Sequence, residues 1–166
     1  MRLAVTSVAA LLLAGVASAD ALHKVAYMAA IDGTCSSLIV GDIDLSGNCL
    51  GRLLNTAYED NYSSFKVSAG NDLLISFFGY DHKAVGDVAH LTVERIIITP
   101  TPKEEPGDTM ADLVAKAQKA TRDLTANGDC EYSNPELSDT HVDCTATADG
   151  KTYSFKFHPI GFKVID

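Results

Sequence analysis

Four cysteines constrain this chain more than any other feature of its sequence, because they fall into two pairs with the same spacing. Cys35 and Cys49 are fourteen positions apart, and so are Cys130 and Cys144. An even number of cysteines is typical of a disulfide framework when a chain is exported. Three pairings are possible in principle, and we favour Cys35–Cys49 with Cys130–Cys144. In the chain-entropy description, closing a loop of about fifteen residues stabilises by roughly 3 kcal/mol.

Both cysteine intervals contain residues that favour a turn. Gly41-Asp42 lies between short apolar runs and suits the tight turn of a β-hairpin. Asn134-Pro135 opens a loop in the second interval. The chain has no CxxC motif, which zinc sites and redox oxidoreductases usually contain. We therefore expect two hairpins, each fastened by its own disulfide.

The first nineteen residues have the three parts of a secretory signal. Met1-Arg2 is a short basic start, residues 3–16 carry no charge, and Ala17-Ser18-Ala19 supplies the small residues of a cleavage site. The alternative is a membrane anchor, but about fourteen apolar residues are too few to span a bilayer comfortably. The pattern predicts a secreted or periplasmic protein, cleaved after residue 19 and not inserted in the membrane, with residues 20–166 as one domain.

The charge of the chain excludes some partners. Its 166 residues carry a formal net charge of −9, and no basic stripe follows the signal. Proteins that bind nucleic acid or anionic membranes usually present a basic surface. We therefore expect neither of these partners.

Most of the remaining chain resembles strands and turns. The runs 73–78 (LLISFF) and 91–99 (LTVERIIIT) are rich in apolar and β-branched residues, as in buried strands. Asp149-Gly150 favours a hairpin turn, and the aromatic residues of 153–157 (YSFKF) alternate with polar ones, as in a half-buried strand. Residues 79–90 are mostly polar and are expected to form a loop.

One helix is expected, at about 109–126. A proline-rich connection, 100–108, precedes it, and Thr109 can cap its first turn together with Asp112. Apolar residues at helical spacing extend to Leu124, and Asn127-Gly128 would end the helix. The predicted fold is α+β: a mostly antiparallel sheet or partly open barrel with this amphipathic helix packed on it.

Two stretches carry a resemblance to known proteins. The first reads AIDGTC at 30–35 and CxGxLxNTxYxD at 49–60, and the second reads GDCxYxNP at 128–135 and CxA at 144–146. Together they resemble a group of small, uncharacterised exported proteins of alphaproteobacteria with two disulfides. The resemblance implies a compartment and an architecture, and it implies no activity or catalytic residues.

Two segments are candidate cation sites. Asp42 and Asp44 begin a stretch that resembles a calcium loop, but the twelfth position is Leu53 rather than the glutamate that an EF-hand requires. The segment 81–90 contains Asp81, His82, Asp87 and His90, which could hold a metal or exchange protons. An acidic turn and a solvated connection are the simpler interpretations of these segments.

No familiar catalytic motif is present: the sequence has no GxSxG, HExxH, P-loop or GxGxxG, and no cofactor is expected. The leading hypothesis is a non-enzymatic module of the cell envelope that binds a protein or a small ligand. One alternative is an envelope hydrolase whose site is assembled from distant residues. The other is a divalent-cation binder that uses Asp42 and Asp44 or the 81–90 segment.

Overall fold

The structure is a computed structural model that describes residues 23–133 and 140–165, and most of these residues lie in antiparallel strands. In chain order the strands are β1 (Val25–Val40), β2 (Ile43–Asp44), β3 (Cys49–Tyr58), β4 (Tyr62–Ala69), β5 (Leu73–Val85), β6 (Val88–Pro100), β7 (Arg122–Ser133), β8 (Val142–Ala148) and β9 (Lys151–Ile165). A short 3-10 turn, η1 (Ser46–Asn48), precedes β3, and the helix α2 (Met110–Ala120) separates β6 from β7.

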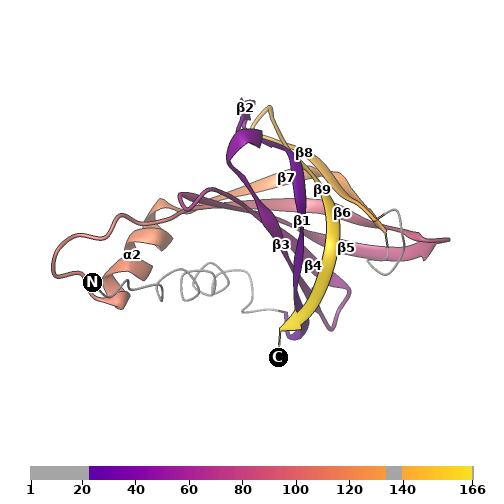
Figure 1. The fold of residues 1–166 in the computed structure, drawn as a ribbon, viewed down its shortest axis with the longest axis horizontal. Coiled ribbons are helices and arrows are strands. Elements are labelled where there is room, and N and C mark those ends of the chain that lie inside the picture. The colour runs from indigo at the N-terminus through magenta and orange to yellow at the C-terminus, as the bar shows by residue number, and fades with distance from the viewer. Residues whose placement is uncertain (1–22, 134–139, 166) are drawn as a thin grey trace.

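The eight long strands form a closed barrel (Figure 1). From β3 to β9, each strand pairs with the next along the chain, and β1 pairs with β3 on one side and β9 on the other. The closing ladder runs from the pair Val40–Tyr153 to the pair Met28–Ile165. The predicted class, a mostly antiparallel barrel with one helix, is confirmed. The expectation of a partly open barrel is wrong, because β9 returns to β1 along almost its whole length.

Two of the predicted turns have the backbone that a tight hairpin needs. Gly41 and Asp42 both have positive φ, 60° and 71°, and so do Asp149 and Gly150, at 51° and 70°. Positive φ at both central residues defines the type I′ turn, whose twist matches that of the flanking strands. These turns join β1 to β2 and β8 to β9.

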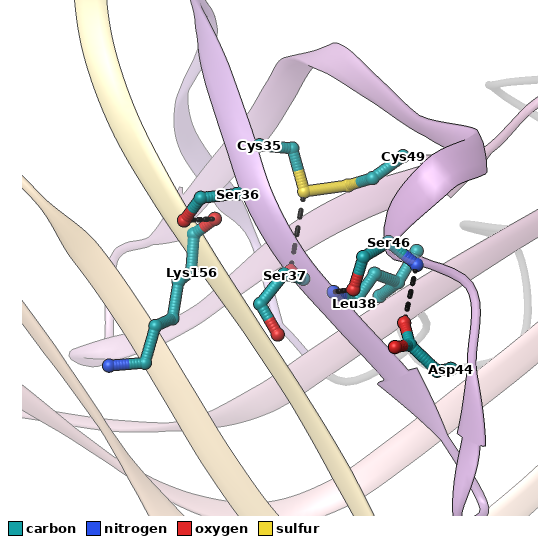
Figure 2. Close-up of a disulfide and its surroundings, with 8 residues drawn as sticks. All are labelled: Cys35, Ser36, Ser37, Leu38, Asp44, Ser46, Cys49 and Lys156. Carbon is teal, nitrogen blue, oxygen red and sulfur yellow. Dashed lines mark hydrogen bonds between the residues drawn. A yellow bond between two sulfur atoms is a disulfide. The ribbon is translucent and has the colours of Figure 1, made fainter.

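Both predicted disulfides are present. Cys35 bonds to Cys49, and Cys130 bonds to Cys144. The first links β1 to the start of β3 around the η1 turn, as Figure 2 shows. The second joins directly opposed residues of β7 and β8 inside the barrel, where both cysteines are buried. The Asn134-Pro135 loop expected in this interval lies outside the described residues.

Large side chains fill the interior of the barrel. Tyr153, Phe155 and Phe157 of β9 are completely buried, which confirms their predicted alternation, and Phe77 packs edge-on against Phe155 with ring centroids 5.2 Å apart. An eight-stranded barrel is just wide enough for side chains to fill it. The interior is therefore the hydrophobic core of the protein.

The helix begins where predicted and ends earlier. Thr109 caps α2 in a reciprocal capping box with Asp112. The predicted end near residue 126 is wrong: α2 stops at Ala120, and Leu124 is a buried residue of β7. Leu124 fits both a helical stripe and a strand alternation, and pairing with Ile96 of β6 decides the outcome.

The predicted polar loop at 79–90 is instead part of a long hairpin. β5 continues to Val85 and β6 begins at Val88, with Gly86 in the turn at a φ of 67°. Backbone pairing along β5 and β6 outweighs the polar composition of this segment. The hairpin extends one end of the barrel, and α2 lies toward the opposite end (Figure 1).

Candidate functional site

A groove on the outer wall of the barrel is the candidate binding site. Its volume is about 770 Å³. One side is the outer surface of β3 to β6, and the other is formed by the chain that follows β6 and by the first turn of α2. The apolar side chains that line it come from both sides: Leu50, Leu54, Leu73, Leu74, Pro100, Pro102, Met110 and Leu113.

Lys116 stabilises the second wall of the groove, which is the side formed by the chain after β6 and by the first turn of α2. The ammonium of Lys116 donates to Asp108 Oδ2 at 2.8 Å and to Glu105 Oε2 at 3.1 Å. The backbone N–H of Glu105 in turn donates to Asp108 Oδ2 at 2.8 Å. These contacts hold the connection between β6 and α2 against the helix. The hydrogen bond and charge of Lys116 also lower the pKa of the Asp108 carboxyl.

The barrel side of the groove includes a buried lysine. Lys66 is only 4% exposed, and its ammonium lies 5.7 Å from the centre of the Phe78 ring. A cation over an aromatic face is attracted by the ring electrons. Ser68 and Thr99 add hydroxyls to the lining, and Arg52 pairs with Asp32 at 2.9 Å on the rim. The groove thus combines an apolar lining with a few fixed polar groups.

The two candidate cation ligands of the first hairpin have structural roles. Asp42 Oδ1 accepts from the backbone N–H of Thr152 at 2.9 Å, which joins the β1–β2 turn to β9. Asp44 Oδ1 accepts from Ser46 N–H at 2.9 Å (Figure 2). The hydrogen bonds from Ser46 lower the pKa of Asp44. Both carboxylates therefore stabilise turns at this end of the barrel.

The other two candidates, Asp81 and His82, do not come together. They are adjacent in β5, and successive side chains of a strand point to opposite faces. Asp81 pairs in register with the buried Leu91, so its side chain is directed inward, whereas His82 is exposed and contacts Thr92 Oγ1 at 2.7 Å. Neither residue is near the turn that holds Asp42 and Asp44.

Asp81 belongs to a polar cluster inside the barrel. Its Oδ1 accepts from the Tyr132 hydroxyl of β7 at 2.8 Å. Burial raises the pKa of the Asp81 carboxyl, although hydrogen bonds from Tyr132 and Ser63 oppose the shift. Burial and the Asp81 contact also raise the pKa of Tyr132. The carboxylate is thus partly desolvated at the end of the core.

The groove was missed at the sequence level because its lining comes from segments far apart in the chain. Leu54 does give a local signal, since it lies between the buried residues Leu53 and Asn55 and would face away from the core. Among the described residues, no group of three or more His, Cys, Asp or Glu side chains is placed so that it could hold a metal ion. No helix within the described ranges has the length and apolarity to cross a membrane.

The chain was compared with protein-family profiles, with curated proteins and with solved structures. None of the three comparisons finds a match.

Proposed function

We propose that this protein is a non-enzymatic binding module that takes a small, mainly apolar molecule into the outer-wall groove. The observation that carries the proposal is the groove itself, with about 770 Å³ of space and eight apolar lining residues. Small-molecule sites typically have volumes of roughly 300–1,000 Å³ and a mostly apolar lining with a few polar groups. The groove has this combination.

Because side chains fill the interior of the barrel, we place the ligand site on the outer wall rather than inside. Barrels that carry a ligand inside leave the interior open, whereas here Phe77, Tyr153, Phe155 and Phe157 fill it. The outer wall beside α2, in contrast, keeps apolar residues such as Met110 half exposed. A ligand would cover this surface and gain the free energy of burying it.

We place this activity outside the cytoplasm. Two disulfides and no free cysteine in the described residues fit an oxidising compartment. The secretory pattern at 1–19 lies outside the described residues and remains a prediction. Together they favour a secreted or periplasmic protein that binds its ligand in the cell envelope. The hydrolase alternative also remains a prediction.

A neutral fluorescent dye, Nile red, tests the groove directly. We expect the dye to bind with a saturable blue shift at one site per chain. Leu74→Arg places a charge on the groove wall and should weaken binding at least about tenfold, which corresponds to about 1.4 kcal/mol. Leu74 is partly exposed on the outer wall, so the substitution should leave the barrel folded.

The matched control is Ile160→Arg, which replaces an exposed apolar side chain on a different strand, β9, with the same charged residue. Ile160 is 81% exposed and does not line the groove. Dye binding should be unchanged in this variant. Equal loss of binding in both variants, or no loss in Leu74→Arg, would contradict the proposed site. Near-ultraviolet circular dichroism establishes that each variant keeps its packed core.

A further inference from the structure

Lys66 of β4 gives the groove a buried ammonium group. Of the β4 residues that line the groove, Lys66 lies furthest from the β4–β5 turn, whereas Gly70 lies in that turn. Phe65 and Val67 on either side of it are buried in the core, so the side chain of Lys66 is directed to the outer wall. The ammonium therefore lies at the end of the groove toward the middle of the barrel wall.

Hydroxyl groups border this lysine on the outer wall. Ser64 and Ser68 are two positions before and after Lys66, and alternate residues of a strand share a face. Thr56 of β3 is the register partner of Ser64, and Ser76 of β5 is the register partner of Lys66, so both project from the same face. Lys66 thus lies within a patch of short polar side chains, which suits a polar group of a ligand.

Two of these hydroxyls lack a hydrogen-bond partner within the described ranges. Thr56 and Ser64 are 1% and 0% exposed, and neither Thr56 Oγ1 nor Ser64 Oγ is hydrogen-bonded there. A buried hydroxyl without a partner is unfavourable, and most buried polar groups in folded proteins are paired. A polar ligand group bound beside Lys66 would supply the missing partner. The unpaired hydroxyls and the ammonium therefore point to the same end of the groove.

We propose that the ligand of the groove is an amphipathic carboxylate, with one carboxylate group bound by Lys66 and an apolar chain lying along Leu54 and Leu74. This inference rests on the proposed function, because it names the class of molecule that the same groove takes. An ammonium has three N–H donors, so Lys66 can bind a ligand carboxylate alongside its contacts within the protein. A carboxylate has two oxygens, and the second can accept from Ser64 or Thr56.

The charges around the groove favour a head group with a single negative charge. Arg52, the other cation of the lining, is largely exposed and is paired with Asp32 at 2.9 Å. Asp32, Glu104 and Asp108 also line the groove and repel anions. One buried ammonium against these carboxylates suits a carboxylate better than a phosphate dianion. The apolar lining provides the rest of the binding free energy through burial of the chain.

Displacement of Nile red from the full-length wild-type chain by three probes with the same twelve-carbon chain tests the inference. The probes are dodecanoate, dodecan-1-ol and dodecyl phosphate at neutral pH. We expect dodecanoate to bind at least about tenfold more tightly than the alcohol, since a charge-assisted hydrogen bond contributes this much. Dodecyl phosphate should bind more weakly than dodecanoate. The comparison needs no variant, so it does not depend on how a substitution affects folding.

Lys66→Met then assigns the preference to one side chain. Methionine keeps an unbranched apolar side chain against Phe78 and removes the ammonium. Dodecanoate binding should weaken at least about tenfold, whereas binding of dodecan-1-ol should change less than about twofold. The matched control is Lys151→Met, which removes the same charge from an exposed position of β9 outside the groove. Both ligands should bind this variant as they bind the wild type.

The outcomes separate this inference from the proposed function. Equal binding of dodecanoate and dodecan-1-ol to the wild type would overturn the carboxylate head group, while displacement of Nile red by the alcohol would still support the groove as an apolar site. A preference for dodecanoate that persists in Lys66→Met, or tighter binding of dodecyl phosphate, would also overturn the inference. Absence of binding by Nile red and by every probe would contradict the proposed function, and the inference with it.

Discussion

The hydroxyl of Tyr132 on β7 donates to the carboxylate of Asp81 on β5 at 2.8 Å, and this hydrogen bond passes across the inner face of β6. It links two strands that are not neighbours in the sheet. Burial raises the pKa of Asp81 despite this bond. A carboxyl group whose pKa is higher in the folded state than in the unfolded chain weakens the fold once it ionises.

Asp81→Asn should therefore stabilise the protein at neutral pH. Asparagine keeps an oxygen that accepts from Tyr132 and removes the buried charge. Because the folded pKa of Asp81 is raised, the wild-type chain loses stability as pH rises from the unfolded value, about 3.9, through the folded value. The advantage of the variant in free energy of unfolding should grow over that interval and then stay constant. Urea titrations at several pH values measure it.

Asp87→Asn controls for the general effect of removing one negative charge. Asp87 is exposed in the turn between β5 and β6. The pH-dependent gain in the free energy of unfolding should be smaller in this variant than in Asp81→Asn. A gain for Asp81→Asn that shrinks as pH rises would show that the folded pKa of Asp81 is lowered instead.

The two disulfides should differ in their resistance to reduction. Cys130 and Cys144 are buried in the core, whereas Cys35 and Cys49 are partly exposed. Thiol–disulfide exchange requires access of a thiolate to sulfur. Under native conditions and limiting reductant, Cys35–Cys49 should open first, and alkylation followed by peptide mass mapping detects the order. Equal rates would mean that the barrel opens globally before either bond is reduced.

Gly79→Ala should destabilise the barrel severely. A Cβ at this position of β5 would meet the backbone oxygen of Thr92 at 1.8 Å, and a backbone atom cannot rotate away. Forcing extra volume into a packed site typically costs about 1–3 kcal/mol, and we expect the upper end. At Gly47 nothing lies within 4 Å of the added Cβ, so Gly47→Ala should stay within about 0.5 kcal/mol of wild type. Thermal unfolding distinguishes the two.

Lys116→Met should loosen the second wall of the groove without unfolding the protein. The variant loses the contacts to Asp108 and Glu105, and ion pairs of this kind near the surface contribute little to global stability. Hydrogen exchange of the amides at 101–109 should accelerate, whereas exchange in β1 and β9 should not change.

The control for that experiment is Lys119→Met, in the last turn of the same helix and exposed. It removes an equal charge at a distance from the connection between β6 and α2. Acceleration of exchange at 101–109 in this variant would show that the effect comes from the change in net charge and not from the contacts of Lys116 with Asp108 and Glu105.

Local features of the fold were predictable from the sequence. The type I′ turns at Gly41-Asp42 and Asp149-Gly150 follow from residues that tolerate positive φ. The disulfide pairs follow from the equal, fourteen-position spacing of the cysteines and the hairpin expected within each interval. The helix start follows from the cap at Thr109. Each of these depends on contacts between residues close together in the chain.

Features that depend on distant pairing were not predictable. Closure rests on pairs such as Val40 with Tyr153, and alternation within one strand does not reveal its partner. Leu124 fits a helix or a strand equally well until Ile96 is known to lie beside it. The same limit hid the groove, because its lining comes from strands β3 to β6 and from the chain up to α2.

Closure of the barrel by β1 and β9 also affects how the chain must fold. Residues that pair between β1 and β9 are about a hundred and twenty positions apart in the sequence, as Cys35 and Phe157 are. The pairing that closes the barrel therefore joins some of the most distant residues of the chain. Such non-local pairing folds slowly, and until it forms two strand edges stay unpaired and open to other chains. Pairing of β9 with β1 therefore removes the exposed strand edges late in folding, and a chain in which β9 has not yet paired is the most prone to aggregate.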